Sequence, residues 1–274
     1  MLSPFIDVTK AVELIDGTDD IAVCDCRAYL DERNGIDSYR AGHIPGARFV
    51  DLETLVSGTP ETGTGGGRHP MPSGGAFAAG LGELGIGHNT TVIAYDDVGG
   101  AIAARFVWML RVLGQSAAII DGGIQAWRGE LETGDLRFEP VVHAARPFPA
   151  DAMAIADDVA ETIDAGGLVV DSRGAARYVG ETEPIDPIAG HIPGAINLPF
   201  AENLHEGALR PADELADRFI DAGVTADTIF YCGSGVTACH NILSAEAAGI
   251  PRPKLYVGSW SGWIDRADPA VANG

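Results

Sequence analysis

The sequence predicts an α/β fold made of two duplicated domains. The hexapeptide GHIPGA occurs at Gly42–Ala47 and again at Gly190–Ala195, and such a repeat indicates duplicated units. Short apolar runs alternate with helical patterns in both halves, which is typical of a mainly parallel sheet flanked by helices on both faces. The length of 274 residues suits two domains of roughly 100–150 residues each.

Each GHIPGA copy follows an apolar run that ends in Asp-x-Arg. The run IAVCDCR closes on Asp25 and Arg27, and GLVVDSR closes on Asp171 and Arg173. Short runs of this kind, rich in β-branched residues, predict buried strands. We expect the four charged residues to form structural ion pairs at the strand ends, since they are present in both copies.

The later part of each half is also repeated. An apolar run reaches Tyr95 in one half and Tyr231 in the other, and a glycine-bearing turn and an amphipathic helix are predicted after each. A last short strand is predicted in IIDGGIQAW, which ends at Trp127, and in LYVGSWSGW, which ends at Trp263. In such sheets, chemistry gathers at the carboxyl ends of the strands.

The predicted domains are residues 1–135 and 153–274, joined by a linker over residues 136–152. The linker region bears prolines and has little periodicity. The first half also contains a Gly/Pro/Thr-rich stretch over residues 57–75 that the second half lacks. This stretch is either a surface loop or a loop that reaches the pocket of the other domain.

The composition excludes several classes of partner. The formal charge of −21 results from 39 acidic and 18 basic residues, and it should repel nucleic acid and acidic membranes. A small anionic substrate would therefore need a locally positive pocket. The sequence contains no apolar run near ~18 residues that could span a membrane and no basic leader at its start, so we expect a cytoplasmic protein.

The four cysteines fit neither a disulfide framework nor a common zinc spacing, and we expect reduced thiols. Cys24 and Cys26, in and next to the first predicted strand of the first half, are interpreted as core residues. Cys239 is interpreted as a packing residue, with a resolving thiol for Cys232 as the alternative.

The two halves differ in the loop that follows the tyrosine. One half reads DDVGG over Asp96–Gly100, and the other reads CGSGVT over Cys232–Thr237. A cysteine that opens a glycine-rich turn into a helix lies over unpaired backbone N–H groups, which favour anions. We therefore expect the pKa of the Cys232 thiol to be lowered, as a sulfur nucleophile requires.

These residues resemble the rhodanese superfamily, and specifically the tandem-domain thiosulfate and 3-mercaptopyruvate sulfurtransferases. The resemblance covers nearly the whole chain and implies that the first domain is an inactive copy, with Asp96 where a nucleophile would stand. It implies that Cys232 becomes a persulfide in the second, catalytic domain. The other loop residues expected to bind substrate are Gly233, Gly235, Val236 and Thr237.

The loop is similar to that of the mercaptopyruvate type. Thiosulfate enzymes usually carry basic residues at its second and third positions, where this chain has Gly233 and Ser234. The substrate-binding arginine of the family matches Arg177, and a guanidinium suits a carboxylate or sulfonate through paired hydrogen bonds. A second family arginine is absent, because Ile185 follows the Glu-Pro pair in its place.

The mercaptopyruvate type is also thought to use a serine, a histidine and an aspartate. Ser234 matches the serine, and His69 in the segment RHPMP matches the histidine. Glu53 stands at the position of the aspartate. We treat His69 and Glu53 as candidate site residues.

The predicted function is ping-pong sulfur transfer through a Cys232 persulfide. The donor would be 3-mercaptopyruvate or thiosulfate, the acceptor would be cyanide, a thiol such as glutathione or a dithiol protein such as thioredoxin, and no metal or organic cofactor would be required. One alternative is a non-enzymatic module that carries persulfide between proteins. A second is a cysteine phosphatase, which is disfavoured because Ala238 stands where such enzymes need an arginine.

Overall fold

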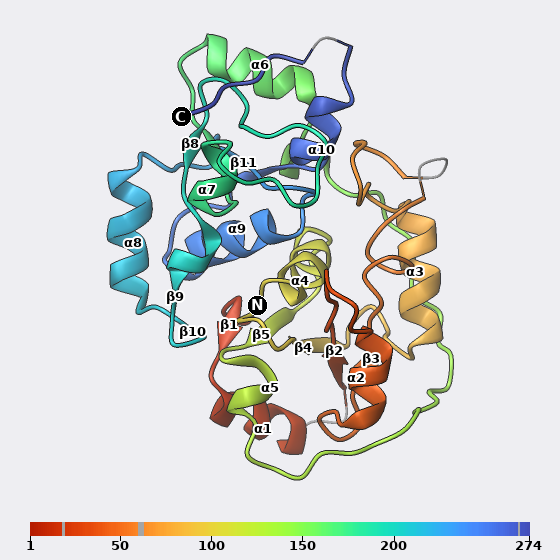
Figure 1. Ribbon diagram of the computed structural model, residues 1–274. Helices are drawn as coiled ribbons and strands as arrows, with labels where there is room; N and C mark the ends of the chain where they lie inside the picture. Colours follow the sequence, from red (N-terminus) through yellow and green to blue (C-terminus); the bar gives the residue numbers. More distant parts are fainter. Residues whose placement is uncertain (18–19, 60–62, 268) are drawn as a thin grey trace. The chain divides into compact units, whose positions relative to one another are not determined.

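The computed structural model describes residues 1–17, 20–59, 63–267 and 269–274. By its contacts the chain divides into two compact units, each with its own five-stranded sheet (Figure 1). The first unit comprises Met1–Gly58, Pro72–Phe148 and Glu206–Leu209. The second comprises Thr59–Met71, Pro149–His205 and Arg210–Gly274.

The units are not simple halves of the sequence. Residues 136–148, in the region predicted as a linker, belong by their contacts to the first unit. The segment Thr59–Met71, from the Gly/Pro/Thr-rich stretch, belongs to the second unit. The domain limits at residues 135 and 153 stay a prediction.

The first unit contains a parallel sheet with strand order β1-β5-β4-β2-β3. Helices flank it, as the alternating pattern predicts. Its elements in chain order are β1 (Phe5–Ile6), α1 (Val8–Gly17), β2 (Ile21–Asp25), α2 (Gly35–Ala41), β3 (Arg48–Phe49), α3 (Gly74–Glu83), β4 (Thr91–Tyr95), α4 (Ala103–Val112), β5 (Ala117–Ile120), α5 (Gly123–Ala126) and β10 (Ala208–Leu209).

The second unit repeats this sheet with the order β6-β12-β11-β7-β8, again parallel. The predicted α/β class with two parallel-sheet domains is therefore confirmed. Its elements are η1 (Ala150–Ala152), β6 (Met153–Ala154), α6 (Ala156–Asp164), β7 (Val169–Asp171), α7 (Ala175–Tyr178), β8 (Ile196–Asn197), η2 (Phe200–Asn203), β9 (Leu204–His205), α8 (Ala212–Asp221), β11 (Ile229–Tyr231), α9 (Thr237–Ala247), β12 (Lys254–Tyr256) and α10 (Ser259–Ile264).

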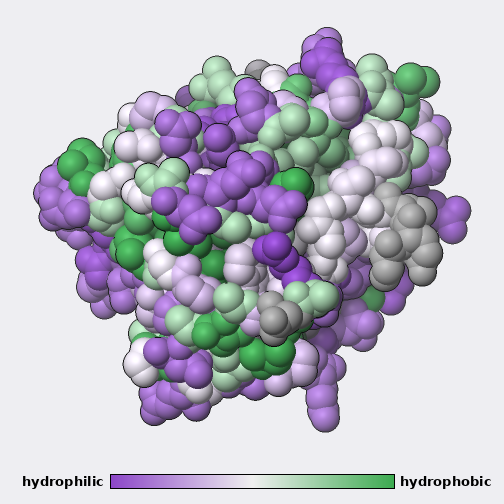
Figure 2. Space-filling view, turned by 90° about the horizontal axis from the view of Figure 1, so that it is seen from above, coloured by the Kyte–Doolittle hydropathy of each residue, from purple (hydrophilic) through white to green (hydrophobic). Residues whose placement is uncertain are grey.

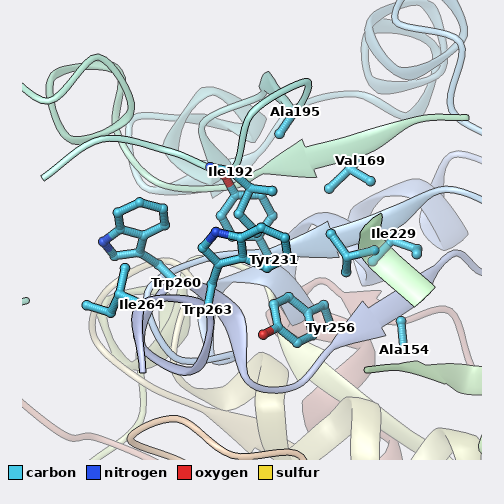
Figure 3. Close-up of a cluster of buried hydrophobic side chains, with 11 residues drawn as sticks. Ala154, Val169, Ile192, Ala195, Ile229, Tyr231, Tyr256, Trp260, Trp263 and Ile264 are labelled. Carbon is cyan, nitrogen blue, oxygen red and sulfur yellow. Dashed lines mark hydrogen bonds between the residues drawn. The ribbon is translucent and has the colours of Figure 1, made fainter. Parts of the chain in front are cut away.

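The core of the second unit follows the two-residue period of its strands. Ile229 and Tyr231 of β11 belong to a buried cluster on one face, whereas Phe230 between them contacts Phe219 of α8 at a ring-centroid distance of 6.3 Å. Figure 3 shows the aromatic rings of the cluster, with Trp260 among them, grouped beside the smaller aliphatic side chains. The strand β11, which carries the loop of interest at its end, is thus held on both faces.

The duplicated Asp-x-Arg residues form the ion pairs predicted from the repeat. Arg27 Nε lies 3.0 Å from Asp25 Oδ1, and Arg173 Nη2 lies 2.6 Å from Asp171 Oδ2. Each arginine also donates from Nη2 to the carbonyl of the first glycine of its GHIPGA copy, at 2.7 Å in both units. The repeat therefore joins a strand end to the following loop in the same way twice.

Two expectations about the later elements are wrong. The helices α4 and α9 are buried along most of their length rather than amphipathic, because α9 packs against α8 and η2 as well as against its sheet. Trp127 directly follows the short helix α5, and Trp263 lies on α10. The two strands β5 and β12 end earlier than the apolar pattern suggests.

Hydrophilic residues are prominent on the visible surface. On the face drawn in Figure 2, hydrophilic residues cover much of the surface and hydrophobic residues form separate smaller groups. Within the described residues, no helix is both long enough and apolar enough to cross a membrane.

Candidate active site

Cys232 directly follows β11 and opens the loop that leads into α9, both labelled in Figure 1. Its side chain is 2 % exposed. The backbone N–H of Gly235 donates to Cys232 Sγ at 3.2 Å, so the chain curls back over the sulfur. Gly235 has a φ of 76°, in the left-handed region where a Cβ is unfavourable.

The start of α10 fixes the other side of this loop. Ser259 Oγ accepts a hydrogen bond from the Cys232 N–H at 3.2 Å. The N–H groups of Trp260 and Ser261 donate to the carbonyls of Cys232 and Gly233 at 2.9 and 3.0 Å. The nucleophile loop is therefore held by backbone hydrogen bonds on both of its flanks.

The equivalent loop of the first unit holds a carboxylate in place of the sulfur. Asp96 is fully buried, and its two oxygens accept hydrogen bonds from four backbone N–H groups at 2.8–3.0 Å. Burial raises the pKa of this carboxyl, and the four donors act against that rise. The donors belong to Val98, Gly100, Ile102 and Ala103. This loop already contains its own anion.

Residues 63–71 pack within the second unit beside the nucleophile loop. The backbone N–H of Arg68 donates to Ser261 Oγ at 3.1 Å. A Cβ on Gly67 would lie 2.4 Å from the carbonyl oxygen of Gly258, so the two backbones approach closely. The Gly/Pro/Thr-rich stretch is thus more than a surface loop, because it brings side chains to the loop that begins with Cys232.

One of these side chains is His69. Its Nδ1 lies 2.7 Å from Ser234 Oγ, two residues along the chain from Cys232. Both side chains are largely buried, with 9 % of His69 and 7 % of Ser234 exposed. The structure therefore brings together the serine and the histidine that the sequence singled out.

Arg177 lies on the short helix α7 and is held by two carboxylates. Its Nε and Nη2 donate to Glu183 at 3.0 and 2.6 Å, and Nη2 also lies 3.2 Å from Asp186 Oδ2. Glu183 in turn accepts from Arg173 Nη1 at 3.2 Å, so the Asp-x-Arg pair of this unit extends to Arg177. The Arg177 guanidinium is therefore held in place by Glu183 and Asp186.

Sequence reasoning missed Arg68. Its Nη1 pairs with Asp186 Oδ1, so Asp186 lies between the guanidinium groups of Arg68 and Arg177. A Cβ on Gly233 would lie 3.0 Å from Arg68 Nη2 and 3.5 Å from both Nη atoms of Arg177. The only signal in the sequence was the position of Arg68 next to His69.

The two carboxylates respond differently to this setting. Burial acts to raise the pKa of Glu183, but hydrogen bonds from Arg177 and from the backbone N–H groups of Asp186 and Ile185 outweigh it and hold the pKa below its ordinary value. Burial raises the pKa of Asp186, with nearby Glu183 acting in the same direction against Arg68 and Arg177. Asp186 is therefore the less firmly ionised partner.

The remaining predicted residues lie in three places. Val236 is the N-cap of α9 without a side-chain cap, and Thr237 is the first residue of the helix. Glu53 is exposed in the turn after β3 and belongs to the first unit. The part assigned to Glu53 stays a prediction.

The other cysteines are buried. Burial raises the pKa of the Cys24 thiol to about 12 and that of Cys26 well above its ordinary value. Cys239 Sγ donates to the Gly235 carbonyl at 3.3 Å, which suits the packing role predicted for it. Cys232 is the cysteine whose sulfur accepts a hydrogen bond from the loop.

Comparison with known proteins identifies the family. The model of the rhodanese-like domain matches residues 7–130 and residues 155–266. The chain belongs to the rhodanese-like family. The resemblance inferred from the two GHIPGA copies and the CGSGVT loop is thereby confirmed, as is the expectation of two such domains.

Rhodanese-family relatives cover almost the whole chain. The probable 3-mercaptopyruvate sulfurtransferase of Pseudomonas aeruginosa is 39% identical and aligns over 93% of each chain. The putative thiosulfate sulfurtransferase SseB of Mycobacterium tuberculosis is 36% identical over 98% of this chain and 96% of its own. Among solved structures, the chain matches SseA of Escherichia coli, which is described as a 3-mercaptopyruvate sulfotransferase with the rhodanese fold. The TM-score is 0.81 and the identity is 34%, over 95% of this chain and 100% of SseA. The predicted enzyme class, sulfurtransferase, is confirmed.

Proposed function

We propose that this rhodanese-family enzyme takes its sulfur from 3-mercaptopyruvate and passes it on through a persulfide on Cys232. The observation that carries the choice of donor is the 2.7 Å contact between His69 Nδ1 and Ser234 Oγ in the nucleophile loop. Several relatives named 3-mercaptopyruvate sulfurtransferase are 33–39% identical to the chain.

The His69–Ser234 pair suits this donor because of one proton. The sulfur of 3-mercaptopyruvate carries a proton as a thiol, and the departing enolate must gain one to become pyruvate. Thiosulfate has no proton on its outer sulfur, and sulfite can leave without one. A hydroxyl bonded to an imidazole can move a proton between such groups, so the pair has a task with the first donor that it lacks with the second.

The first half-reaction is displacement at the donor sulfur. The Cys232 thiolate forms a bond to that sulfur, the carbon–sulfur bond breaks, and its electrons leave as the enolate of pyruvate. The thiol proton passes through Ser234 Oγ and His69 to the enolate carbon. The loop N–H of Gly235 and the helix that follows favour the negative charge that remains on Cys232–S–S⁻.

The second half-reaction returns Cys232 to its thiolate. Cyanide attacks the outer sulfur, forms thiocyanate and releases the Cys232 thiolate. A dithiol protein such as thioredoxin acts by the same attack through one thiolate. Its second thiol then displaces hydrosulfide and closes a disulfide.

Arg177 is assigned to the carboxylate of the donor. The Glu183 carboxylate fixes its Nε and Nη2, and its Nη atoms lie beside the Cα of Gly233, next to the nucleophile. A guanidinium placed in this way can bind a carboxylate while the sulfur of the same small molecule reaches Cys232. The Asp96 loop of the first unit would take no part in the covalent steps.

The test is steady-state sulfur transfer to cyanide from each donor, with Cys232→Ser measured alongside. We expect a higher kcat/KM with 3-mercaptopyruvate than with thiosulfate, and no turnover by the Cys232→Ser variant. Cys239→Ser is the matched control and should keep its activity. A preference for thiosulfate would overturn the donor assignment, and full activity in Cys232→Ser would overturn the persulfide.

A further inference from the structure

Arg68 lies beside the nucleophile loop, but the sulfur transfer through Cys232 proposed above gives it no role. Its backbone is fixed by the bond to Ser261 Oγ, so its side chain extends from a defined point. A Cβ on Gly233 would be closer to Arg68 Nη2 than to either Nη atom of Arg177, at 3.0 Å against 3.5 Å. Two guanidinium groups therefore lie against the residue that follows the nucleophile.

The three arginines of this cluster differ in how far they are committed to the protein. The side chains of Arg173, Arg177 and Arg68 are 2 %, 20 % and 33 % exposed, in that order. Arg173 and Arg177 are both bound to Glu183, whereas Arg68 pairs with Asp186. An anion that enters from solvent thus meets the most exposed guanidinium, paired with the carboxylate that is less firmly ionised.

We infer that Arg68 is a second donor-binding cation, and that Asp186 is a resident carboxylate that an anionic donor displaces from it. The donor carboxylate then lies between Arg68 and Arg177, where Asp186 bridges the same two groups in the free protein. This inference rests on the proposed function for the identity of the donor, but the anion site itself does not depend on it.

The glycine at the second loop position belongs to the same arrangement. A side chain on Gly233 would compete for the space that the two guanidinium groups occupy. The positive charge therefore comes from outside the loop, from Arg68, rather than from a basic residue within it. Ile185 likewise contributes no charge, so within this cluster the second cation facing Gly233 is Arg68.

The experiment compares alkylation of Cys232 by iodoacetate and by iodoacetamide. Both reagents form a carbon–sulfur bond to the Cys232 thiolate and release iodide, but only iodoacetate carries a carboxylate that the cations can hold. The quantity compared is the rate with iodoacetate divided by the rate with iodoacetamide. We expect Arg68→Gln to lower this ratio at least about tenfold, because the ionic hydrogen bond between the guanidinium and the carboxylate of iodoacetate is lost. Arg68→Lys should recover part of that ratio.

The matched control is Arg252→Gln. Arg252 is paired with Glu246 and is 27 % exposed, but Glu246 lies at the far end of α9, about 14 Å along the helix from its start. This variant should leave the ratio unchanged. Asp186→Asn should raise the ratio, because it removes the carboxylate that neutralises Arg68 while Arg177 stays on Glu183, whereas a merely structural role for the pair predicts no rise.

A second measurement keeps the inference independent of alkylation and of turnover. Binding of 3-mercaptopyruvate and of thiosulfate is measured by calorimetry on the Cys232→Ser protein, with and without Arg68→Gln. We expect Arg68→Gln to weaken the binding of 3-mercaptopyruvate, the proposed donor, at least about tenfold. Equal ratios and equal affinities with and without Arg68 would overturn this inference and leave the persulfide intact. An enzyme that transfers no sulfur but shows the Arg68 effect would overturn the proposed function alone.

Discussion

His69 Nδ1 lies 2.7 Å from Ser234 Oγ, although 165 residues separate them in the chain. The contact exists because the segment Thr59–Met71 belongs to the second unit, where it packs against the start of α10. The same segment brings Arg68 next to Gly233 of the nucleophile loop. One excursion of the chain thus supplies both an imidazole and a guanidinium, and the CGSGVT loop contains neither.

This contact predicts a donor-dependent defect in His69→Gln. Glutamine keeps a polar group but cannot accept and return a proton, so transfer from 3-mercaptopyruvate should fall about 10²–10⁴-fold in kcat. Transfer from thiosulfate should change by less than about threefold, since no proton has to move. The measurement is the ratio of kcat with the two donors.

His205→Gln, which changes an exposed histidine of the same unit, is the control and should match the unmodified enzyme with both donors. Ser234→Ala should share the selective defect, and the double variant should be no worse than the more impaired single one. Equal losses with both donors in His69→Gln would indicate a packing role and contradict the proton assignment.

Sequence reasoning singled out Cys232 from its local pattern and Arg177 from the family resemblance, but it did not single out Arg68. Cys232 could be predicted because a nucleophile, its strand and its glycine-rich turn are contiguous in the sequence. Arg68 could not, because its place depends on the Asp186 partner 118 residues away and on the packing of Gly67 against Gly258. Trp127 and Trp263 show the same limit, since an apolar run gives no sign that its last turns belong to a short helix.

The cysteines of the first unit predict a pH-dependent labelling pattern. Because burial raises the pKa of Cys24 to about 12 and that of Cys26 well above its ordinary value, both thiols stay protonated as the pH rises through 8. The thiolate is the reactive form, so neither should react with iodoacetamide in the folded protein at pH 8. Peptide mass spectrometry should find the label on Cys232, and on Cys24 and Cys26 after unfolding in urea.

A Cys232→Ser protein serves as the control for this labelling and should take up little reagent while folded. Rapid labelling of Cys24 or Cys26 at pH 8 in the folded protein would contradict the pKa directions. It would also show that strand β2 opens far more readily than its buried position implies.

Asp96→Asn should destabilise the first unit without removing any side-chain volume. One oxygen of Asp96 accepts from Val98 and Gly100, and the other accepts from Ile102 and Ala103. An asparagine has one oxygen, so its NH₂ group must face two backbone N–H donors, one buried and one part-buried, that lose their acceptor. A buried donor left in this way costs about 1–3 kcal/mol and a part-buried one costs less, so the free energy of unfolding should fall by roughly 1–4 kcal/mol. Hydrogen exchange in increasing urea, read separately on peptides from β4 and β11, should show the loss at β4. Asp16→Asn, at an exposed position on α1, should show none, and unchanged protection of β4 in Asp96→Asn would mean that this loop does not depend on its internal anion.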